Sequence, residues 1–100
     1  MKNRQLRYAL EYAEELYVKA KEECADEFIY EARSLYTLII AHTQSYNFTF
    51  DEIEDHIRAL EFQIKMVATV LDTNYEKYLK LIEQIKSEIE EAKKMEAKWT

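Results

Sequence analysis

The fold is decided by the stretch Ser45-Tyr46-Asn47-Phe48-Thr49-Phe50-Asp51-Glu52-Ile53, which combines a helix stop with a helix start. Asn47 suits a left-handed residue that ends the first helix, because Asn tolerates a positive φ better than most non-glycine residues. Thr49 and Glu52 have the spacing of a capping box, and Phe48 and Ile53 have the spacing of a hydrophobic staple. The stretch therefore predicts a tight reversal at 46–49 with a helix on either side.

The composition restricts the fold to helices. The chain has 100 residues and contains neither glycine nor proline, the residues on which most hairpins, tight turns and phosphate loops depend. Hydrophobic residues make up 48% of the chain, which is too many for a disordered segment. We therefore predict an all-α single domain over residues 1–100.

The charge and the apolar pattern set expectations for the surroundings of the protein. The formal net charge is −6, which disfavours direct binding to nucleic acid or to an anionic membrane. No apolar run approaches the roughly 18 residues of a membrane span, and there is no signal-peptide pattern. The single cysteine cannot form an internal disulfide, which suits a reducing compartment. We expect a cytoplasmic protein without membrane contact.

Two apolar stripes with steps of three and four residues predict the helices. The first stripe consists of Leu6, Leu10, Ala13, Tyr17, Ala20, Cys24, Phe28, Ala32, Leu35, Ile39, His42 and Tyr46. The second consists of Ile53, Ile57, Leu60, Ile64, Val67, Leu71, Tyr75, Tyr78, Ile82, Ile85, Ile89 and Ala92. Their unbroken phase favours a long antiparallel hairpin, with helices at about 4–46 and 50–98. On this hypothesis Cys24 is a buried core thiol.

Each stripe also has one position where its helix could end. Two consecutive steps of four occur at 20–24–28, where Asp26 could cap a new helix, and again at 67–71–75. Thr73 and Glu76 form a second capping-box spacing there. A break near 72–74 alone would give three helices, and an additional break near 24–26 would give a monomeric four-helix bundle.

The width of the apolar faces bears on the oligomeric state. The face is broad over 28–40, and Phe62, Met66, Val70, Leu79 and Leu81 widen the second stripe. A two-helix hairpin cannot cover both broad faces, because each helix has only one neighbour. We therefore expect two chains to assemble into a homodimeric four-helix bundle.

The sequence contains no recognisable catalytic or cofactor motif. A P-loop, a dinucleotide fingerprint and a paired-cysteine zinc motif are all missing, so we expect a protein that is not an enzyme and needs no cofactor. His42 and His56 lie near the reversal and close to Glu52, but the E-x-x-H spacing of di-metal bundles is absent because residue 53 is Ile. We expect structural or solvated histidines and assign no metal ligands.

Acidic clusters and exposed tyrosines suggest a surface that binds another protein. The candidate partner-binding residues are Glu11, Glu14, Glu15, Glu22, Glu23, Asp26, Glu27, Tyr8, Tyr12, Tyr30, Asp51, Glu52, Glu54 and Asp55. The first hypothesis is a small acidic interaction module that self-associates and binds a protein partner. An alternative is a phage-type inhibitor of a nucleic-acid-processing or defence enzyme, whose carboxylates imitate phosphates. A further alternative is a binder of a small ligand or a metal.

Overall fold

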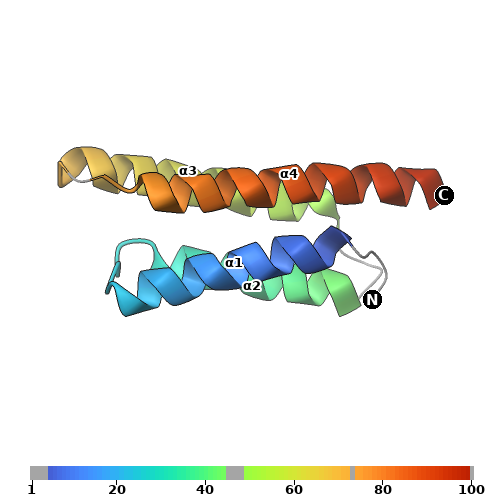
Figure 1. Cartoon of the computed structure of the whole chain (residues 1–100), viewed down its shortest axis with the longest axis horizontal. Helices are drawn as coiled ribbons and strands as arrows, with labels where there is room; N and C mark the ends of the chain where they lie inside the picture. Colours follow the sequence, from blue (N-terminus) through green and yellow to red (C-terminus); the bar gives the residue numbers. More distant parts are fainter. Residues whose placement is uncertain (1–4, 45–48, 73, 100) are drawn as a thin grey trace.

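A computed structural model describes residues 5–44, 49–72 and 74–99, and every regular element in these ranges is a helix. The helices are α1 (Gln5–Glu22), α2 (Ile29–Gln44), α3 (Phe50–Val70) and α4 (Glu76–Trp99). They form an antiparallel bundle in which α1 and α2 make one layer and α3 and α4 the other (Figure 1). Each helix packs on its neighbours in the chain, and α1 also packs on α4, which closes the bundle. The bundle extends over 46 × 18 × 18 Å.

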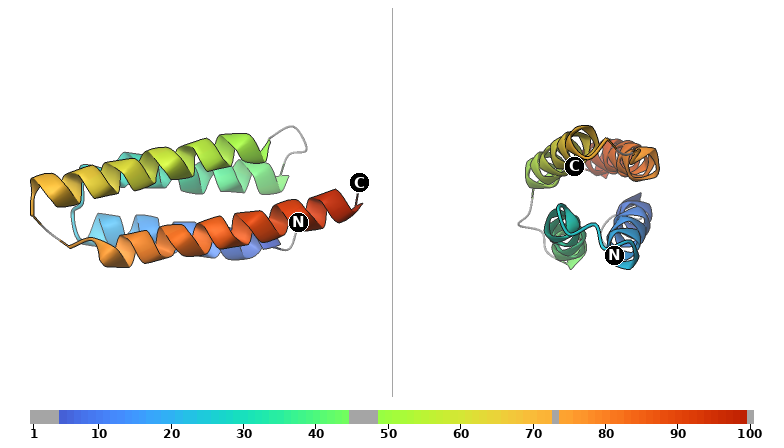
Figure 2. Two further views of the ribbon diagram at one scale, coloured as in Figure 1. Left: turned by 90° about the horizontal axis from the view of Figure 1, so that it is seen from above. Right: turned by 90° about the vertical axis from the view of Figure 1, so that its left-hand side faces the viewer.

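A single chain thus supplies the four helices that were expected from two. The all-α prediction is confirmed, whereas the prediction of one continuous helix at about 4–46 is wrong. The alternative breaks near 24–26 and near 72–74 are both present, so each long segment is divided into two helices, as in the alternative of a monomeric four-helix bundle. The end-on view shows the helices arranged around a common axis (Figure 2), and buried residues from all of them form one core. The broad apolar faces that called for a second chain are therefore largely covered by helices of the same chain.

The first break is a Schellman turn built without glycine. Cys24 has a φ of 54°, in the left-handed region. The amide of Ala25 donates to the carbonyl oxygen of Ala20 over 2.9 Å, and the amide of Cys24 donates to that of Lys21 over 3.3 Å. These are the two hydrogen bonds that define the motif, and the buried Ala20 and Ala25 supply its apolar contact. Because the turn points residue 24 outward, the predicted buried thiol is wrong and Cys24 is exposed.

The apolar stripe continues through this turn, which explains why its phase did not reveal the break. Ala25 and Phe28 lie outside the helices, yet both are buried. The ring of Phe28 packs at 5.0 Å from Tyr78 and at 5.5 Å from Tyr75. The loop therefore contributes core residues at the spacing that an uninterrupted helix would have used.

The second break uses the same left-handed geometry at another non-glycine residue. Asp72 has a φ of 51°, and its amide donates to the carbonyl oxygen of Thr69. The following helix is capped by Asn74, whose Oδ1 accepts a hydrogen bond from the amide of Glu76 over 2.8 Å. The capping role predicted for Thr73 falls outside the described residues. Asn74, the residue next to the predicted cap, therefore provides a side-chain cap for α4.

The reversal between α2 and α3 is described in part. Thr49 is the N-cap of α3, as the capping-box spacing indicates, with extended backbone angles of −107° and 153°. Its side chain makes no capping hydrogen bond, so the position of the cap is confirmed and the bond itself is not found. The predictions for Asn47 and Phe48 lie outside the described residues.

The core follows both stripes closely. The buried hydrophobic residues are Leu6, Ala9, Ala13, Leu16, Ala20, Ala25, Phe28, Ala32, Leu35, Ile39, Ile53, Ile57, Leu60, Ile64, Tyr78, Leu81, Ile82, Ile85, Ile89 and Ala92. In α1 the buried face is displaced by one position, because Ala9 and Leu16 are buried while Leu10 and Tyr17 are partly exposed. Among the described residues, no helix is long and apolar enough to cross a membrane.

Candidate functional site

The acidic residues predicted on the first helix are mostly exposed. Glu14 and Glu22 are exposed on α1, and Asp26 and Glu27 are exposed in the loop that follows. Glu11 and Glu15 are exposed as well, but each forms an ion pair within α1: Glu11 lies 3.6 Å from Arg7, and Glu15 lies 3.5 Å from Lys19. Exposed pairs of this kind contribute little to stability and can be exchanged for a partner's charges at small cost.

Glu23 is also exposed, but it differs from the other acids predicted on the first helix because its partners lie on another helix. Its carboxylate accepts hydrogen bonds from the ammonium of Lys77 and from the hydroxyl of Tyr78, both on α4. The hydrogen bond from Lys77, followed by that from Tyr78, lowers the pKa of Glu23. Burial, and then the hydrogen bond to Glu23, strongly raise the pKa of Tyr78. Glu23 therefore joins the end of α1 to α4 at the surface of the bundle.

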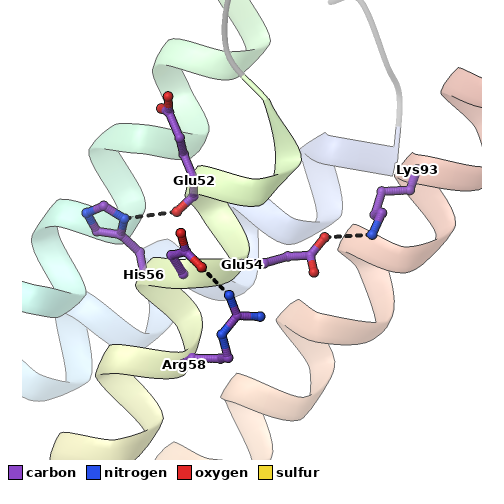
Figure 3. Close-up of polar contacts among 6 residues, drawn as sticks. Glu52, Glu54, His56, Arg58 and Lys93 are labelled. Carbon is purple, nitrogen blue, oxygen red and sulfur yellow. Dashed lines mark hydrogen bonds and ion pairs between the residues drawn. The ribbon is translucent and has the colours of Figure 1, made fainter.

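The second acidic cluster lies at the N-terminal end of α3 and is partly neutralised (Figure 3). Glu54 lies 2.7 Å from the ammonium of Lys93 on α4, and that hydrogen bond raises the pKa of Lys93. Asp55 forms an ion pair with Arg58, one turn further along α3. Asp51 and Glu52 are exposed. The carboxylates of this cluster therefore differ in how accessible they are to a partner.

The structure places the two acidic clusters at opposite ends of the bundle. Residues 22–27 lie at the turn between α1 and α2, whereas residues 51–55 lie beside the reversal between α2 and α3 (Figure 1). The 16 residues of α2 lie between the two clusters, a length of roughly 24 Å at about 1.5 Å per residue. Charges this far apart are separated by about three Debye lengths at physiological salt, each of about 8 Å. The clusters are therefore two separate electrostatic features.

The two histidines lie at the same end of the bundle, as predicted, but in different surroundings. His42 is buried in the last turn of α2, with its ring centroid 4.6 Å from that of Phe50. Nδ1 of His56 lies 2.9 Å from the carbonyl oxygen of Glu52 (Figure 3), which binds the ring to its own helix. Within the described ranges, no group of three or more His, Cys, Asp or Glu side chains is arranged to hold a metal ion.

A cleft between α3 and α4 has an apolar floor and a charged rim. Its volume is about 310 Å³, and it is lined by Glu54, Ile57, Arg58, Lys86, Ile89 and Glu90. Lys86 lies 2.7 Å from Glu61, which lowers the pKa of Glu61 and raises that of Lys86 through their hydrogen bond. Glu54 and Lys86 have their ionic partners on the other helix, so they join α3 to α4, whereas Arg58 is paired within α3.

The predicted tyrosines divide into two groups. Tyr8 and Tyr30 are exposed, so both are accessible to a partner. Tyr12 is partly buried against the core. Tyr30 is the more exposed of the first two, with 75% of its surface accessible. It lies in the first turn of α2.

A group of exposed apolar side chains on α3 was not predicted as a site. Phe62, Met66 and Val70 follow one another at intervals of four residues, and their exposed fractions are 64%, 50% and 76%. Residues at this spacing form a continuous ridge along one side of a helix. We name these three residues the α3 ridge.

The α3 ridge lies on the outward side of α3, and its Val70 end is turned toward α2. A helical projection at about 100° per residue places Phe62 and Met66 on the side away from the buried residues of α3, with Val70 nearest to His56. His56 lines a shallow hollow together with α2. The hollow has a volume of about 600 Å³ and is lined by Tyr30, Arg33, Ser34, Thr37, Leu38, Ala41 and His56. We call the α3 ridge together with this hollow the α2–α3 face. It lies opposite the side of the bundle where α1 packs on α4 (Figure 2).

The difference in helix length explains why the end of the ridge is uncovered. α3 has 21 residues and α2 has 16, so α3 is roughly 7.5 Å longer at about 1.5 Å per residue. The turn between α3 and α4 accordingly extends past the turn between α1 and α2 (Figure 1). Val70 and Leu71 are exposed at this overhang. The interval of four in 62–66–70 was visible in the sequence, but it was read as part of a covered face.

Comparison with known proteins gave no match to a protein-family model, a curated protein or a solved structure.

Proposed function

We propose that this chain is a protein–protein interaction module that self-associates and binds a second protein, and that it is not an enzyme. The observation that carries the proposal is the α2–α3 face, where Tyr30, Phe62, Met66 and Val70 are all at least half exposed. Exposed apolar side chains that gather on one face are typical of interaction sites, whereas scattered ones need no explanation.

The size of the exposed surface supports this proposal. From their exposed fractions, these four side chains present on the order of 500 Å² of largely apolar surface. Removing that area from water would contribute roughly 12 kcal/mol before the costs of association are subtracted, at about 25 cal/mol per Å². Since those costs are about 4–15 kcal/mol, the net affinity of such a face is expected to be modest.

The acidic ends suggest what kind of surface a second protein would present. Glu22, Asp26 and Glu27 are exposed at one end of the bundle, and Asp51 and Glu52 at the other. With a net charge of −6, the chain would attract a partner with a basic surface and increase the rate of encounter. Charge of this kind contributes to selectivity, while buried apolar contacts contribute most of the affinity.

Inhibition of a nucleic-acid-processing enzyme by charge mimicry is a second candidate. It is favoured by one observation, the exposed carboxylates of Glu22, Asp26 and Glu27 around the turn between α1 and α2. On this hypothesis they would occupy a groove that normally binds phosphates. Binding would then be dominated by ionic contacts and would weaken steeply with salt.

Affinity capture from the native host with three forms of the protein tests both candidates. The forms are the wild type, the triple variant Glu22→Gln/Asp26→Asn/Glu27→Gln, and the double variant Phe62→Ser/Met66→Ser. Captured proteins are quantified by mass spectrometry at about 0.05 and 0.5 M salt. A protein retained at high salt and lost with Phe62→Ser/Met66→Ser supports the interaction module. A protein lost at high salt and with the triple variant supports mimicry. If no protein depends on either set of residues, both candidates are wrong.

A further inference from the structure

We infer that the α2–α3 face is the self-association surface, and that two copies of this chain pack their α3 ridges against each other about a two-fold axis. The inference rests on the proposed function, because it names the residues through which the self-association would occur. The occupant of the face is a second copy of the same chain, which the shape, charge and area of the face favour.

The shape of the α3 ridge suits pairing with an identical ridge. Phe62, Met66 and Val70 occupy an i, i+4, i+8 row on α3. When two such rows interdigitate, the helices cross at about −50°, which is the commonest class of helix packing in globular proteins. A two-fold axis brings the same row of each copy into the contact, so one ridge provides both halves of a closed interface. The arrangement ends at two copies and does not continue into a filament.

The charge of the face favours a second copy. Each chain carries a net charge of −6, so two chains repel each other over most of their surfaces. The acid of α3 nearest to the ridge on this side is Asp55, which is paired with Arg58. From residue 58 to residue 70, the positions on and beside the α3 ridge are Arg58, Ala59, Phe62, Gln63, Met66, Thr69 and Val70. None of these is an acid. The hollow on the α2 side is lined by one charged residue, Arg33, and otherwise by neutral ones. Two acidic chains can therefore approach here with less repulsion than at either acidic end.

The overhang of α3 adds a steric reason. The C-terminal end of α3 extends beyond the shorter α2 (Figure 1), and Val70 and Leu71 at this end of the helix are exposed. A second α3 that crosses near Met66 would lie over this end of the ridge. The second copy would thereby cover apolar side chains that no helix of the same chain reaches.

The available area is sufficient for a weak dimer. About 500 Å² per chain gives roughly 1,000 Å² for the pair, near the lower limit for a specific interface. Interfaces of this size bind weakly unless they are very well packed. We therefore expect a reversible monomer–dimer equilibrium in the micromolar range, in which the 12.1 kDa chain is monomeric when dilute.

Sedimentation equilibrium of the purified chain from about 1 µM to 0.5 mM measures this equilibrium. The wild type should shift from 12.1 kDa toward twice that mass. Phe62→Glu and Met66→Glu should each weaken dimerisation by at least tenfold, because each places a carboxylate in an apolar contact. Val18→Glu, at an exposed apolar position of α1, is the matched control and should dimerise like the wild type. Far-ultraviolet circular dichroism verifies that all variants remain folded.

A charge-swap experiment tests the two-fold arrangement itself. Met66→Glu and Met66→Lys should each be monomeric when alone, and their equimolar mixture should form a heterodimer. The reason is that a two-fold axis near Met66 brings the opposite charges together. Heterodimer formation supports the inference, and a mixture that remains monomeric overturns the assignment of residue 66 to the axis.

Two further outcomes would overturn the inference. One is a wild-type chain that stays monomeric at about 0.5 mM. The other is a dimer that survives Phe62→Glu and is lost with Val18→Glu. A monomeric chain that still captures a host protein through Phe62 and Met66 would assign the face to that protein and leave the proposed interaction module intact. A dimeric chain that captures nothing from its host would support self-association through this face and would overturn the binding of a second protein.

Discussion

Replacing Cys24 with glycine should stabilise the protein, and the sign of this effect separates a broken helix from a continuous one. Cys24 follows α1 with a φ of 54°, where an L-residue pays roughly 1–2 kcal/mol that glycine does not. Its side chain is exposed, so little packing is lost. Glycine also gains freedom in the unfolded chain, which offsets part of the benefit. The expected net gain is roughly 0.5–1 kcal/mol.

A continuous helix at about 4–46 predicts the opposite sign. Residue 24 would then lie in a helix interior, where glycine costs about 1 kcal/mol relative to the better helix formers. Glu14→Gly is the matched control, because Glu14 is exposed in the middle of α1 and glycine should cost about 1 kcal/mol there on either architecture. Asp72→Gly should behave like Cys24→Gly, because Asp72 has a φ of 51° at the second break.

Urea denaturation followed by far-ultraviolet circular dichroism measures these differences as shifts in the midpoint at constant slope. Thermal melting should agree, with about 4–8 °C for each kcal/mol in a domain of this size. Protein concentrations are kept low enough for the chain to be monomeric. If Cys24→Gly lowered the stability as much as Glu14→Gly does, the Schellman turn after α1 would be refuted.

Three other predictions concern caps and buried polar groups. Asn74→Ala should lower the free energy of unfolding by about 1 kcal/mol, because the Oδ1 of Asn74 caps α4. Thr49→Ala should lower it distinctly less, because the side chain of Thr49 makes no capping hydrogen bond. Equal losses of stability in urea denaturation would contradict this. The lowered pKa of Glu61 predicts that its ion pair with Lys86 stabilises the fold above about pH 4.5 and is lost as the pH falls through the lowered pKa, so Glu61→Gln should flatten the acid limb of a pH–stability profile. Tyr78→Phe should lower the free energy of unfolding by about 1 kcal/mol, because the carboxylate of Glu23 loses the hydrogen bond that the Tyr78 hydroxyl donates. An unchanged midpoint of urea denaturation would mean that this hydrogen bond does not form.

The sequence determined the helical class and most of the core. Without glycine or proline, the chain has few ways to build strands and hairpins, and apolar spacing alone identifies residues such as Leu35, Ile57 and Ile85 as buried. The N-cap at Thr49 could also be located, because the residue types that begin a helix are strongly biased. These features depend on local geometry, to which a sequence pattern responds directly.

The number of helices depended on tertiary packing. The stripe passes through residues 24–28 without losing its phase, because Ala25 and Phe28 leave the helix and still enter the core. The rings of Tyr75 and Tyr78 hold Phe28 there, and they come from a segment about 50 residues away. Residue type alone rarely identifies a left-handed conformation when the residue is not glycine, so the positive φ angles of Cys24 and Asp72 could not be predicted from the sequence.

Exposure on the α2–α3 face also depended on tertiary structure. The period of 62–66–70 identifies a ridge but does not say whether another helix covers it. That depends on how far α2 reaches along α3 and on which helix stands at each corner of the bundle, and both follow from the positions of the breaks. Similarly, the acids of 22–27 and 51–55 look alike in sequence, yet only the structure shows that Glu23 and Glu54 form ion pairs with lysines of α4. A residue's type and spacing determine which side of its own helix it occupies, whereas its burial and its ionic partners depend on helices distant in the chain.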